Sequence, residues 1–170
     1  TTIACAQPNF IFGLTNTFSY KGWSLNLFVE GSQGNDIFNA TRIDTEGMID
    51  FRNQAKTVLA RWKRPGMITD IPRVGNSENI HNSTRFIEYG SYIRIKSVTL
   101  SYDVNKKWLK KAHLSKLQAY ITGQNLLTMT KYSGYDPEVN AYGTSAVAQG
   151  VDYGTYPQSK SIIFGLNVEF

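Results

Sequence analysis

The sequence has few of the residues that build catalytic and metal sites. Cys5 is its only cysteine, and His81 and His113 are its only histidines. A single cysteine excludes an internal disulfide and a cysteine-based metal cage. Neither histidine has a second ligand at metal-site spacing, so we expect both to be solvent-exposed, and no Ser-His-Asp or Cys-His arrangement has local support. The sequence therefore predicts no enzyme, no cofactor and no metal site.

Long apolar runs and concentrated charge are also missing. No segment approaches the ~20 consecutive apolar residues of a transmembrane helix, whereas crossing a membrane by strands stays possible. The net charge of +5 is spread along the chain, and the one dense basic cluster is KKWLKK at 106–111. Nucleic-acid-binding proteins usually carry a basic face, so no nucleic-acid partner is expected. The chain starts with neither Met nor an apolar leader, so we expect a piece of a longer protein.

What the sequence does have is a two-residue alternation of apolar and small or polar residues. From Ser161 to Phe170 only Ile163 breaks this alternation. Such alternation predicts β-strands, and Lys21-Gly22 predicts a tight turn between the first two of them. Ile93 and Ile95 lie on the opposite parity from Val98 and Leu100, which predicts a β-bulge near Lys96-Ser97. The expected strands are residues 8–20, 23–33, 86–104, 115–127 and 159–170.

Two long connections interrupt these strands, at about residues 34–85 and 128–158. In the first, apolar residues spaced by three and four predict one amphipathic helix that begins near Asp44 or Thr45 and ends before Pro65-Gly66. These apolar residues are Met48, Phe51, Ala55, Val58, Leu59 and Trp62. The second connection is rich in Tyr, Gly and Asp.

The connections alternate between short and long, as in transmembrane β-barrels with short periplasmic turns and longer outer loops. One strand face would then meet lipid and the other a wet lumen. Five strands cannot close a barrel, which needs at least ~8, so further strands must belong to it. The side chains expected to be exposed when this chain is taken alone are Phe12, Leu25, Leu27, Leu100, Ile121, Phe164 and Leu166.

Four segments and the chain end resemble one protein family in the same order. They are GLTNTFSYKGWSLNLFVEGSQGNDIFN at 13–39, RWKRPGMITDIPR at 61–73, STRFIEYGSYIRIKSVTLSY at 83–102, ITGQNLLTMTKYSGYDPEV at 121–139 and the terminal FGLNVEF. The chain resembles the C-terminal part of SusC/RagA-type TonB-linked outer-membrane transporters. The resemblance implies an all-β fold, with five C-terminal antiparallel strands of a barrel of about 22 strands and one amphipathic helix in a long extracellular loop. The plug and TonB box are expected to lie outside this chain.

The family resemblance also implies function and partners. Such transporters sit in the bacterial outer membrane and import oligosaccharides or oligopeptides through the TonB complex, beneath a SusD-like lipoprotein lid. Further implied partners are the rest of the barrel and plug, the lipid bilayer and the outer-membrane assembly machinery. The resemblance gives the last strand a role as the signal for that machinery, through Phe164, Leu166, Val168 and Phe170.

Seven residues are candidate contacts to the outer vestibule or the lid: Trp62, Tyr132, Tyr135, Asp136, Tyr142, Tyr153 and Tyr156. Tyrosine is enriched at interfaces, but these rings could equally pack their loop against itself. Asp136 could instead cap a turn before Pro137. The alternative to a transporter is a soluble, secreted β-sandwich module that binds carbohydrate through its aromatic loops.

Overall fold

The computed structural model describes residues 3–109, 114–138, 140–143 and 149–170. The chain forms two compact units. The first, which we call the sheet unit, comprises residues 9–33, 91–131 and 158–170. The second, which we call the loop unit, comprises residues 1–8, 34–90 and 132–157. Among the described residues, no helix is long and apolar enough to cross a membrane.

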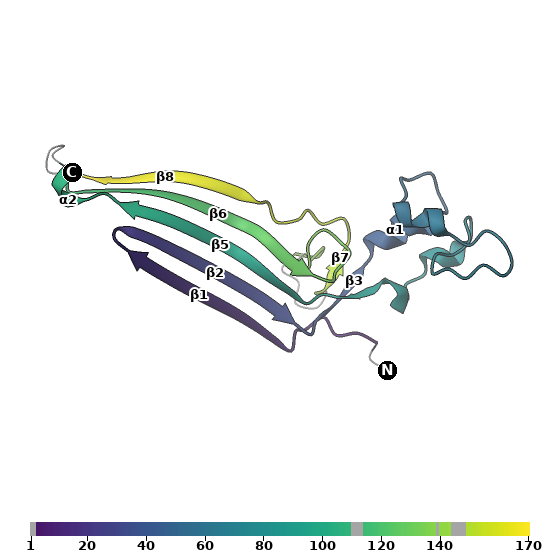
Figure 1. Cartoon of the computed structure of the whole chain (residues 1–170). Helices are drawn as coiled ribbons and strands as arrows, with labels where there is room; N and C mark the ends of the chain where they lie inside the picture. Colours follow the sequence, from purple (N-terminus) through teal and green to yellow (C-terminus); the bar gives the residue numbers. More distant parts are fainter. Residues whose placement is uncertain (1–2, 110–113, 139, 144–148) are drawn as a thin grey trace. The chain divides into compact units, whose positions relative to one another are not determined.

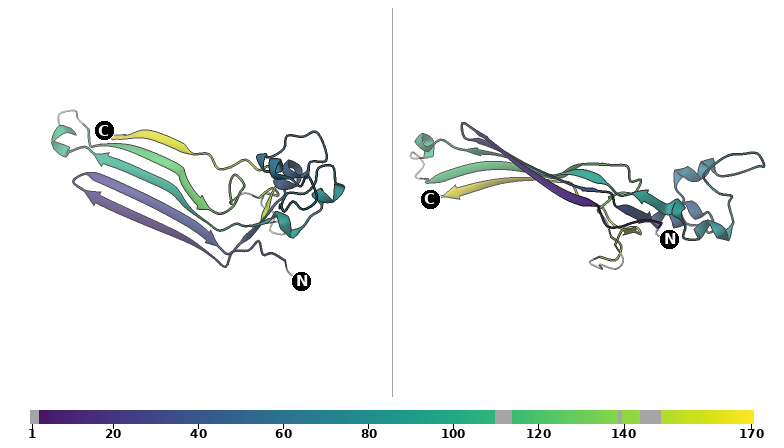
Figure 2. Two further views of the ribbon diagram at one scale, coloured as in Figure 1. Left: turned by 45° about the vertical axis from the view of Figure 1, so that its right-hand side comes forward. Right: turned by 90° about the horizontal axis from the view of Figure 1, so that it is seen from below.

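The sheet unit is a single antiparallel sheet (Figures 1 and 2). Its strand order is β1-β2-β5-β6-β8, so each strand pairs with the next sheet strand along the chain. This meander confirms the predicted all-β fold with five antiparallel strands. The strands are β1 (Phe10–Tyr20), β2 (Trp23–Gln33), β5 (Tyr92–Asp103), β6 (Lys116–Thr130) and β8 (Ser161–Glu169), and a short helix, α2 (Lys106–Leu109), lies between β5 and β6.

The local backbone features predicted for the sheet are confirmed. Lys21 and Gly22 have φ angles of 45° and 86°, the left-handed pair that a two-residue hairpin turn needs. The registers of β5 with both β2 and β6 shift between Ile95 and Ser97. Lys96 is the unpaired residue there, so the bulge lies where the change of parity predicted it.

One face of the sheet carries an exposed apolar row. The row crosses all five strands, because directly paired residues share a face: Phe18 with Leu25, Leu25 with Leu100, Leu100 with Ile121, and Ile121 with Phe164. Six of the seven side chains predicted to be exposed are so, whereas Leu27 is half-buried. Leu27 lies between Asn16 and Val98 in the middle of the sheet, where its neighbours cover part of it. A sandwich would cover this row.

The opposite face is joined by hydrogen bonds between uncharged side chains. These bonds follow the pairing of the strands, so each side chain finds its partner on the neighbouring strand. They include Ser19 Oγ to Ser24 Oγ at 3.1 Å, Asn26 Nδ2 to Thr17 Oγ1 at 2.9 Å, Thr99 Oγ1 to Thr122 Oγ1 at 2.9 Å and Asn167 Nδ2 to Gln118 Oε1 at 3.1 Å. Ile163 pairs with Thr122, which places this apolar residue on the polar face.

The loop unit contains a second, smaller sheet that the sequence did not predict. Its order is β4-β3-β7, with β3 antiparallel to β4 and parallel to β7. The strands are β3 (Asp36–Asn39), β4 (Ile87–Tyr89) and β7 (Val151–Asp152), and the helical segments are α1 (Thr41–Gly47) and the 3₁₀ turns Lys56–Ala60, Ser77–Ile80 and Thr84–Phe86. Ile37 and Phe86 are almost fully buried. Most buried apolar side chains of the described residues therefore belong to the loop unit.

The predicted strand over residues 86–104 is wrong in its first part. β4 belongs to the loop unit, and the sheet strand β5 starts only at Tyr92. The division lies at Gly90, whose N–H donates to the Asn35 carbonyl at 2.8 Å. A Cβ at Gly90 would lie 2.7 Å from the Ile37 side chain, so this close approach needs glycine. The next sheet strand, β6, continues to Thr130 rather than ending near residue 127.

The helix predicted from residue 44 to the Pro65-Gly66 step is also much shorter than expected. α1 begins at Thr41 and ends at Gly47, because Met48 takes a left-handed φ of 54°. Gln54 then folds back: its Oε1 accepts the Met48 N–H at 3.1 Å, and its Nε2 donates to the Asp44 carbonyl at 3.4 Å. These bonds use backbone groups that a longer helix would need for itself. The apolar periodicity was therefore misleading, and Phe51 is fully exposed.

Candidate functional site

A network of ion pairs in the loop unit joins α1, β4 and the segment before β4. Arg42 of α1 places one guanidinium nitrogen 3.0 Å from Glu46 Oε2 and the other 3.0 Å from Glu88 Oε1. Arg85 lies 2.8 Å from the same Glu46 oxygen, and Thr57 donates to the other Glu46 oxygen at 3.0 Å. Glu46 is only 4% exposed, so its charge depends on these partners. The network fixes the position of α1.

Glu88 connects this network to the loop that follows β6. Its Oε2 accepts the Ser133 backbone N–H at 2.8 Å, and its Oε1 accepts the Ser133 hydroxyl at 2.9 Å and the Asn39 amide at 3.1 Å. Burial alone would raise the pKa of Glu88, but the bonds from Ser133 and the Arg42 guanidinium outweigh it and lower the pKa below its ordinary value. Glu88 is therefore an ionised carboxylate that bonds to two segments distant in sequence, through Arg42 and Ser133.

A second set of bonds holds the region around β7 against α1. The Tyr132 hydroxyl donates to Asp152 Oδ2 at 2.6 Å. Burial, then this bond, raises the pKa of Tyr132, so the hydroxyl keeps its proton and remains a donor. The Gly154 N–H donates to Thr41 Oγ1 at 2.8 Å, and the Tyr153 hydroxyl donates to Asp44 Oδ2 at 2.9 Å. Both long connections thus form one hydrogen-bonded structure.

These segments line an open cavity of about 480 Å³, which we call the α1 cavity. Its walls come from α1, the segment at 53–57, the turn at 133–135, Asn39 and Asp152. Most of its polar side chains are uncharged, and its charged lining residues are held by the bonds described above. A cavity of this size can take a small molecule or one part of a larger one.

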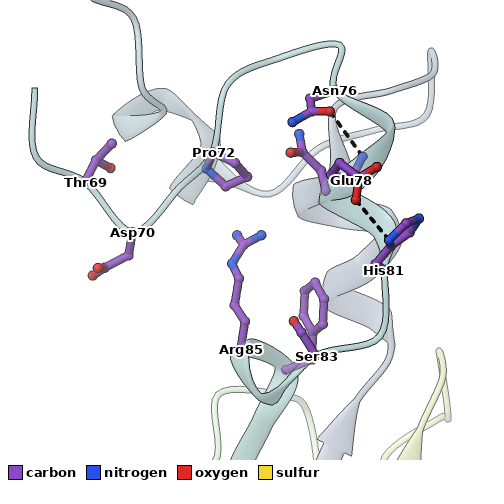
Figure 3. A pocket seen from close by; sticks show the side chains of 10 residues that line it. Thr69, Asp70, Pro72, Asn76, Glu78, His81, Ser83 and Arg85 are labelled. Atoms are coloured by element: carbon purple, nitrogen blue, oxygen red, sulfur yellow. Dashed lines mark hydrogen bonds and ion pairs between the residues drawn. The ribbon is translucent and has the colours of Figure 1, made fainter. Parts of the chain in front are cut away.

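A second cavity, of about 380 Å³, lies beside the 3₁₀ turn at Ser77–Ile80 (Figure 3). Glu78 is one of its lining residues. The Glu78 backbone N–H donates to Asn76 Oδ1 at 3.2 Å, and its carboxylate lies 3.1 Å from His81 Nδ1. Both side chains of this pair are exposed, so the contact contributes little to stability, and His81 is solvent-exposed as predicted. His113 lies outside the described residues. Within the described part of the chain, no group of three or more His, Cys, Asp or Glu could hold a metal ion.

The structure separates the predicted vestibule contacts into covered and open residues. Tyr132 is 6% exposed, and Trp62 is half-buried. Asp136 is buried, and its Oδ1 accepts the Glu138 N–H at 2.9 Å. This bond caps the turn, which was the alternative role predicted for Asp136 from the sequence. The open ones are Tyr135, Tyr142, Tyr153 and Tyr156. Only Tyr135, at 82% exposed, also lines the α1 cavity.

Three of the four residues of the predicted assembly signal lie on the exposed apolar face. Phe164, Leu166 and Val168 pair with Ile121, Ala119 and Leu117 on β6. Phe164 is 75% exposed, and Phe170 is 93% exposed directly after the end of β8. Phe164, Leu166 and Val168 therefore lie on one face of an edge strand, and Phe170 is exposed just beyond its end.

Sequence reasoning missed the charged residues of the network. Arg42 and Glu46 are spaced by four, a pattern that favours contact on a helix, but the predicted helix began after Arg42. Glu88 lies inside a segment that was predicted as sheet strand. No local spacing connects either residue to Ser133, so this part of the site had no signal in the sequence.

The hydrogen bonds from Ser133 to the Glu88 carboxylate are expected to weaken in acid. Because the folded pKa is lowered, the ionised carboxylate stabilises the loop unit fully above the ordinary glutamate pKa of about 4.3, and this contribution is lost as the pH falls through the lower folded value. In the full-length protein, amide exchange at Ser133, corrected for the intrinsic rate, should increase over that range. Glu88→Gln should show fast exchange already at pH 7 and little further change in acid. A wild-type exchange profile that stays flat would contradict this assignment.

Comparisons with known proteins agree with this architecture. No family model matches the sequence. TonB-dependent receptor P3 of Formosa agariphila is 34% identical over 167 residues, which cover 96% of this chain and 16% of that protein. TonB-dependent receptor SusC of Bacteroides thetaiotaomicron is 24% identical over 166 residues, covering 94% of this chain and 15% of that protein. The chain thus spans about one sixth of the length of the curated relatives it matches.

Solved structures give the same relationship. The RagAB peptide importer in its closed-closed state matches with a TM-score of 0.82 and 28% identity, covering 97% of this chain and 18% of that chain. The open-open state of RagAB matches with a TM-score of 0.80 and 27% identity. A meander with one exposed apolar face, together with these relatives, defines a barrel segment of the TonB-dependent receptor class. Within that class, the chain belongs to the SusC/RagA family of outer-membrane transporters, as its motifs predicted.

Proposed function

We propose that this chain is a barrel segment of a transporter that imports oligomeric nutrients, glycans or peptides, across the bacterial outer membrane. The observation that carries the proposal is the apolar row on the sheet unit. Exposed apolar rows of this extent are unfavourable in water, and a lipid bilayer would bury this one while the backbone groups stay paired within the sheet. The named activities of the relatives, TonB-dependent receptor and peptide importer, support the same conclusion.

The loop unit would form part of the outer vestibule. Both long connections leave the sheet at the same end, because β2 and β6 run in the same direction in the antiparallel order. In the proposed orientation this end faces the outside, where a SusD-like lipoprotein would cover the vestibule. The exposed tyrosines at positions 142, 153 and 156 are candidate contacts to that lid or to the substrate. TonB would act through parts of the protein outside this chain.

The test uses the full-length protein in cells with and without TonB. We expect wild-type protein in the outer-membrane fraction, heat-modifiable on gels, and uptake of its nutrient only when TonB is present. Deleting Phe170 should lower the heat-modifiable fraction and the uptake by the same factor, since the exposed end of β8 is proposed as the assembly signal. Unchanged insertion after this deletion would contradict the role of Phe170. Uptake without TonB, or a wild-type protein that remains soluble, would contradict the proposed function.

A further inference from the structure

The apolar face of the sheet unit ends in a row of aromatic side chains with polar edges. Tyr20 pairs with Trp23, and Trp23 pairs with Tyr102, so these three residues share one face at the end of the sheet where β1 turns into β2. The Trp23 and Tyr102 rings lie 4.8 Å apart, and Tyr20 and Trp23 are exposed. At the opposite end, the same face carries Phe12 and Ile93, which have no polar edge. Tyrosine and tryptophan favour the boundary between apolar and wet surroundings.

A positive charge lies directly beside this aromatic row. The Lys21 side chain places its Nζ 5.1 Å from the centroid of the Tyr20 ring, within the range of a cation–π contact. Lys21 is exposed and makes no ion pair within the described part of the chain. The carboxylates of Asp103 and Glu169, at the same end of the sheet, alternate with apolar-face residues and so project from the opposite face. The aromatic row is therefore bordered by a cation without an internal partner.

The short helix α2 adds lysines to the same end of the sheet. Its sequence is KKWL, with lysine at positions 106 and 107, and its Trp108 is 76% exposed. The Asp103 N–H, just before α2, donates to the Gly22 carbonyl at 2.8 Å. The turn between β1 and β2 therefore lies beside the segment that leads into α2 (Figure 1). Lysine and exposed aromatic residues thus occur together along this edge of the sheet unit.

We propose that this edge, formed by residues 20–23, Tyr102 and α2, binds an anionic phospholipid of the periplasmic leaflet. The lipid phosphate would contact the Lys21 ammonium, its ester region would lie at the Trp23 and Tyr102 rings, and its acyl chains would continue along the apolar row. A negative headgroup is favoured over a zwitterionic one because lysines near a membrane surface attract anionic lipid. The inference rests on the proposed function, which places the short turns on the periplasmic side, and adds a lipid class with its contact residues.

The test is native mass spectrometry of the full-length protein in an uncharged detergent, titrated with phosphatidylglycerol or with phosphatidylcholine of the same acyl chains. Wild-type protein should bind phosphatidylglycerol about tenfold more tightly than phosphatidylcholine. Lys21→Gln should weaken phosphatidylglycerol binding about fivefold, the usual effect of one lysine near an anionic membrane surface, and Lys21→Arg should retain the wild-type affinity. Combining Lys21→Gln with Lys106→Gln and Lys107→Gln should abolish the preference between the two lipids.

The matched control is Lys160→Gln, which removes an exposed lysine of the same unit at the other end of β8 and should leave binding unchanged. Equal binding of the two lipids by the wild-type protein, which needs no substitution, would overturn the inference. So would a preference that survives in the triple variant, or equal weakening by Lys21→Gln and Lys160→Gln, with folding of each variant checked by heat-modifiability. A protein that inserts and transports with TonB but shows no lipid preference refutes only the lipid site, whereas a wild-type protein that fails to insert refutes the proposed function.

Discussion

Replacing Ile121 with arginine is expected to remove most of the folded barrel from the outer membrane of cells that make the full-length protein. Ile121 lies in the middle of β6 and pairs with Leu100 on one side and Phe164 on the other, all on the exposed apolar face. An arginine facing lipid at the bilayer midplane costs about 2–4 kcal/mol, a large part of the stability of an ordinary domain. The heat-modifiable fraction of outer-membrane preparations measures the loss.

The matched control for this variant is Thr122→Arg, which places the same side chain one residue further along β6. Thr122 pairs with Thr99 and Ile163 on the polar face and shares one hydrogen bond with Thr99 at 2.9 Å. This variant should lose only that bond, worth about 1 kcal/mol, and most of the protein should still insert. Equal losses for the two variants would show that the apolar face does not contact lipid.

The second large effect is expected inside the loop unit, where Glu46→Ala should release α1. The substitution removes one carboxylate from between Arg42 and Arg85 and leaves both guanidinium groups without their shared partner. Removing one partner of a buried ion pair typically costs about 3–5 kcal/mol. The two arginines are partly exposed, so we expect roughly half of that. Hydrogen exchange of the segment 41–47 should increase by about 10- to 100-fold in the full-length protein.

Glu78→Ala provides the comparison for Glu46. Glu78 also contacts a neighbouring side chain, His81, but both side chains are mostly exposed, and even fully charged pairs of this kind contribute about 0–1 kcal/mol. Exchange in the segment 41–47 should therefore stay at the wild-type rate in this variant. Equal exchange rates of the segment 41–47 in the two variants would show that the network around Glu46 does not stabilise α1.

The strands of the sheet unit could be predicted from the sequence because each has its own two-residue signal. Alternation located the strands, and the change of parity before Val98 located the bulge. The loop unit was harder to predict because its elements are short and are fixed by partners far along the chain. α1 ends where Gln54 folds back on it, and β4 is separated from β5 at Gly90, whose N–H donates to the carbonyl of the distant Asn35.

The candidate site shows the same limit at the level of single residues. Tyr132 and Tyr135 lie three positions apart in one aromatic loop, yet the first is buried on Asp152 and the second is exposed at the α1 cavity. Composition cannot distinguish them, since both rings satisfy the same local pattern. Only the pairing of β3 with β7 brings Asp152 beside Asn39 and decides which tyrosine is covered.

The bulge at Lys96 determines the charge that the sheet presents to its surroundings. In an unbroken strand, Lys96 and Arg94 would share the phase of Val98 and Leu100 and would project from the apolar face. The extra residue shifts the phase, so Arg94 pairs with Glu30 and Thr128, and Lys96 reaches Glu30 at 2.8 Å, while Ile93 and Ile95 take the apolar side. Each cation spared from lipid avoids a cost of up to about 2–4 kcal/mol. The bulge thereby keeps two positive charges off the apolar face.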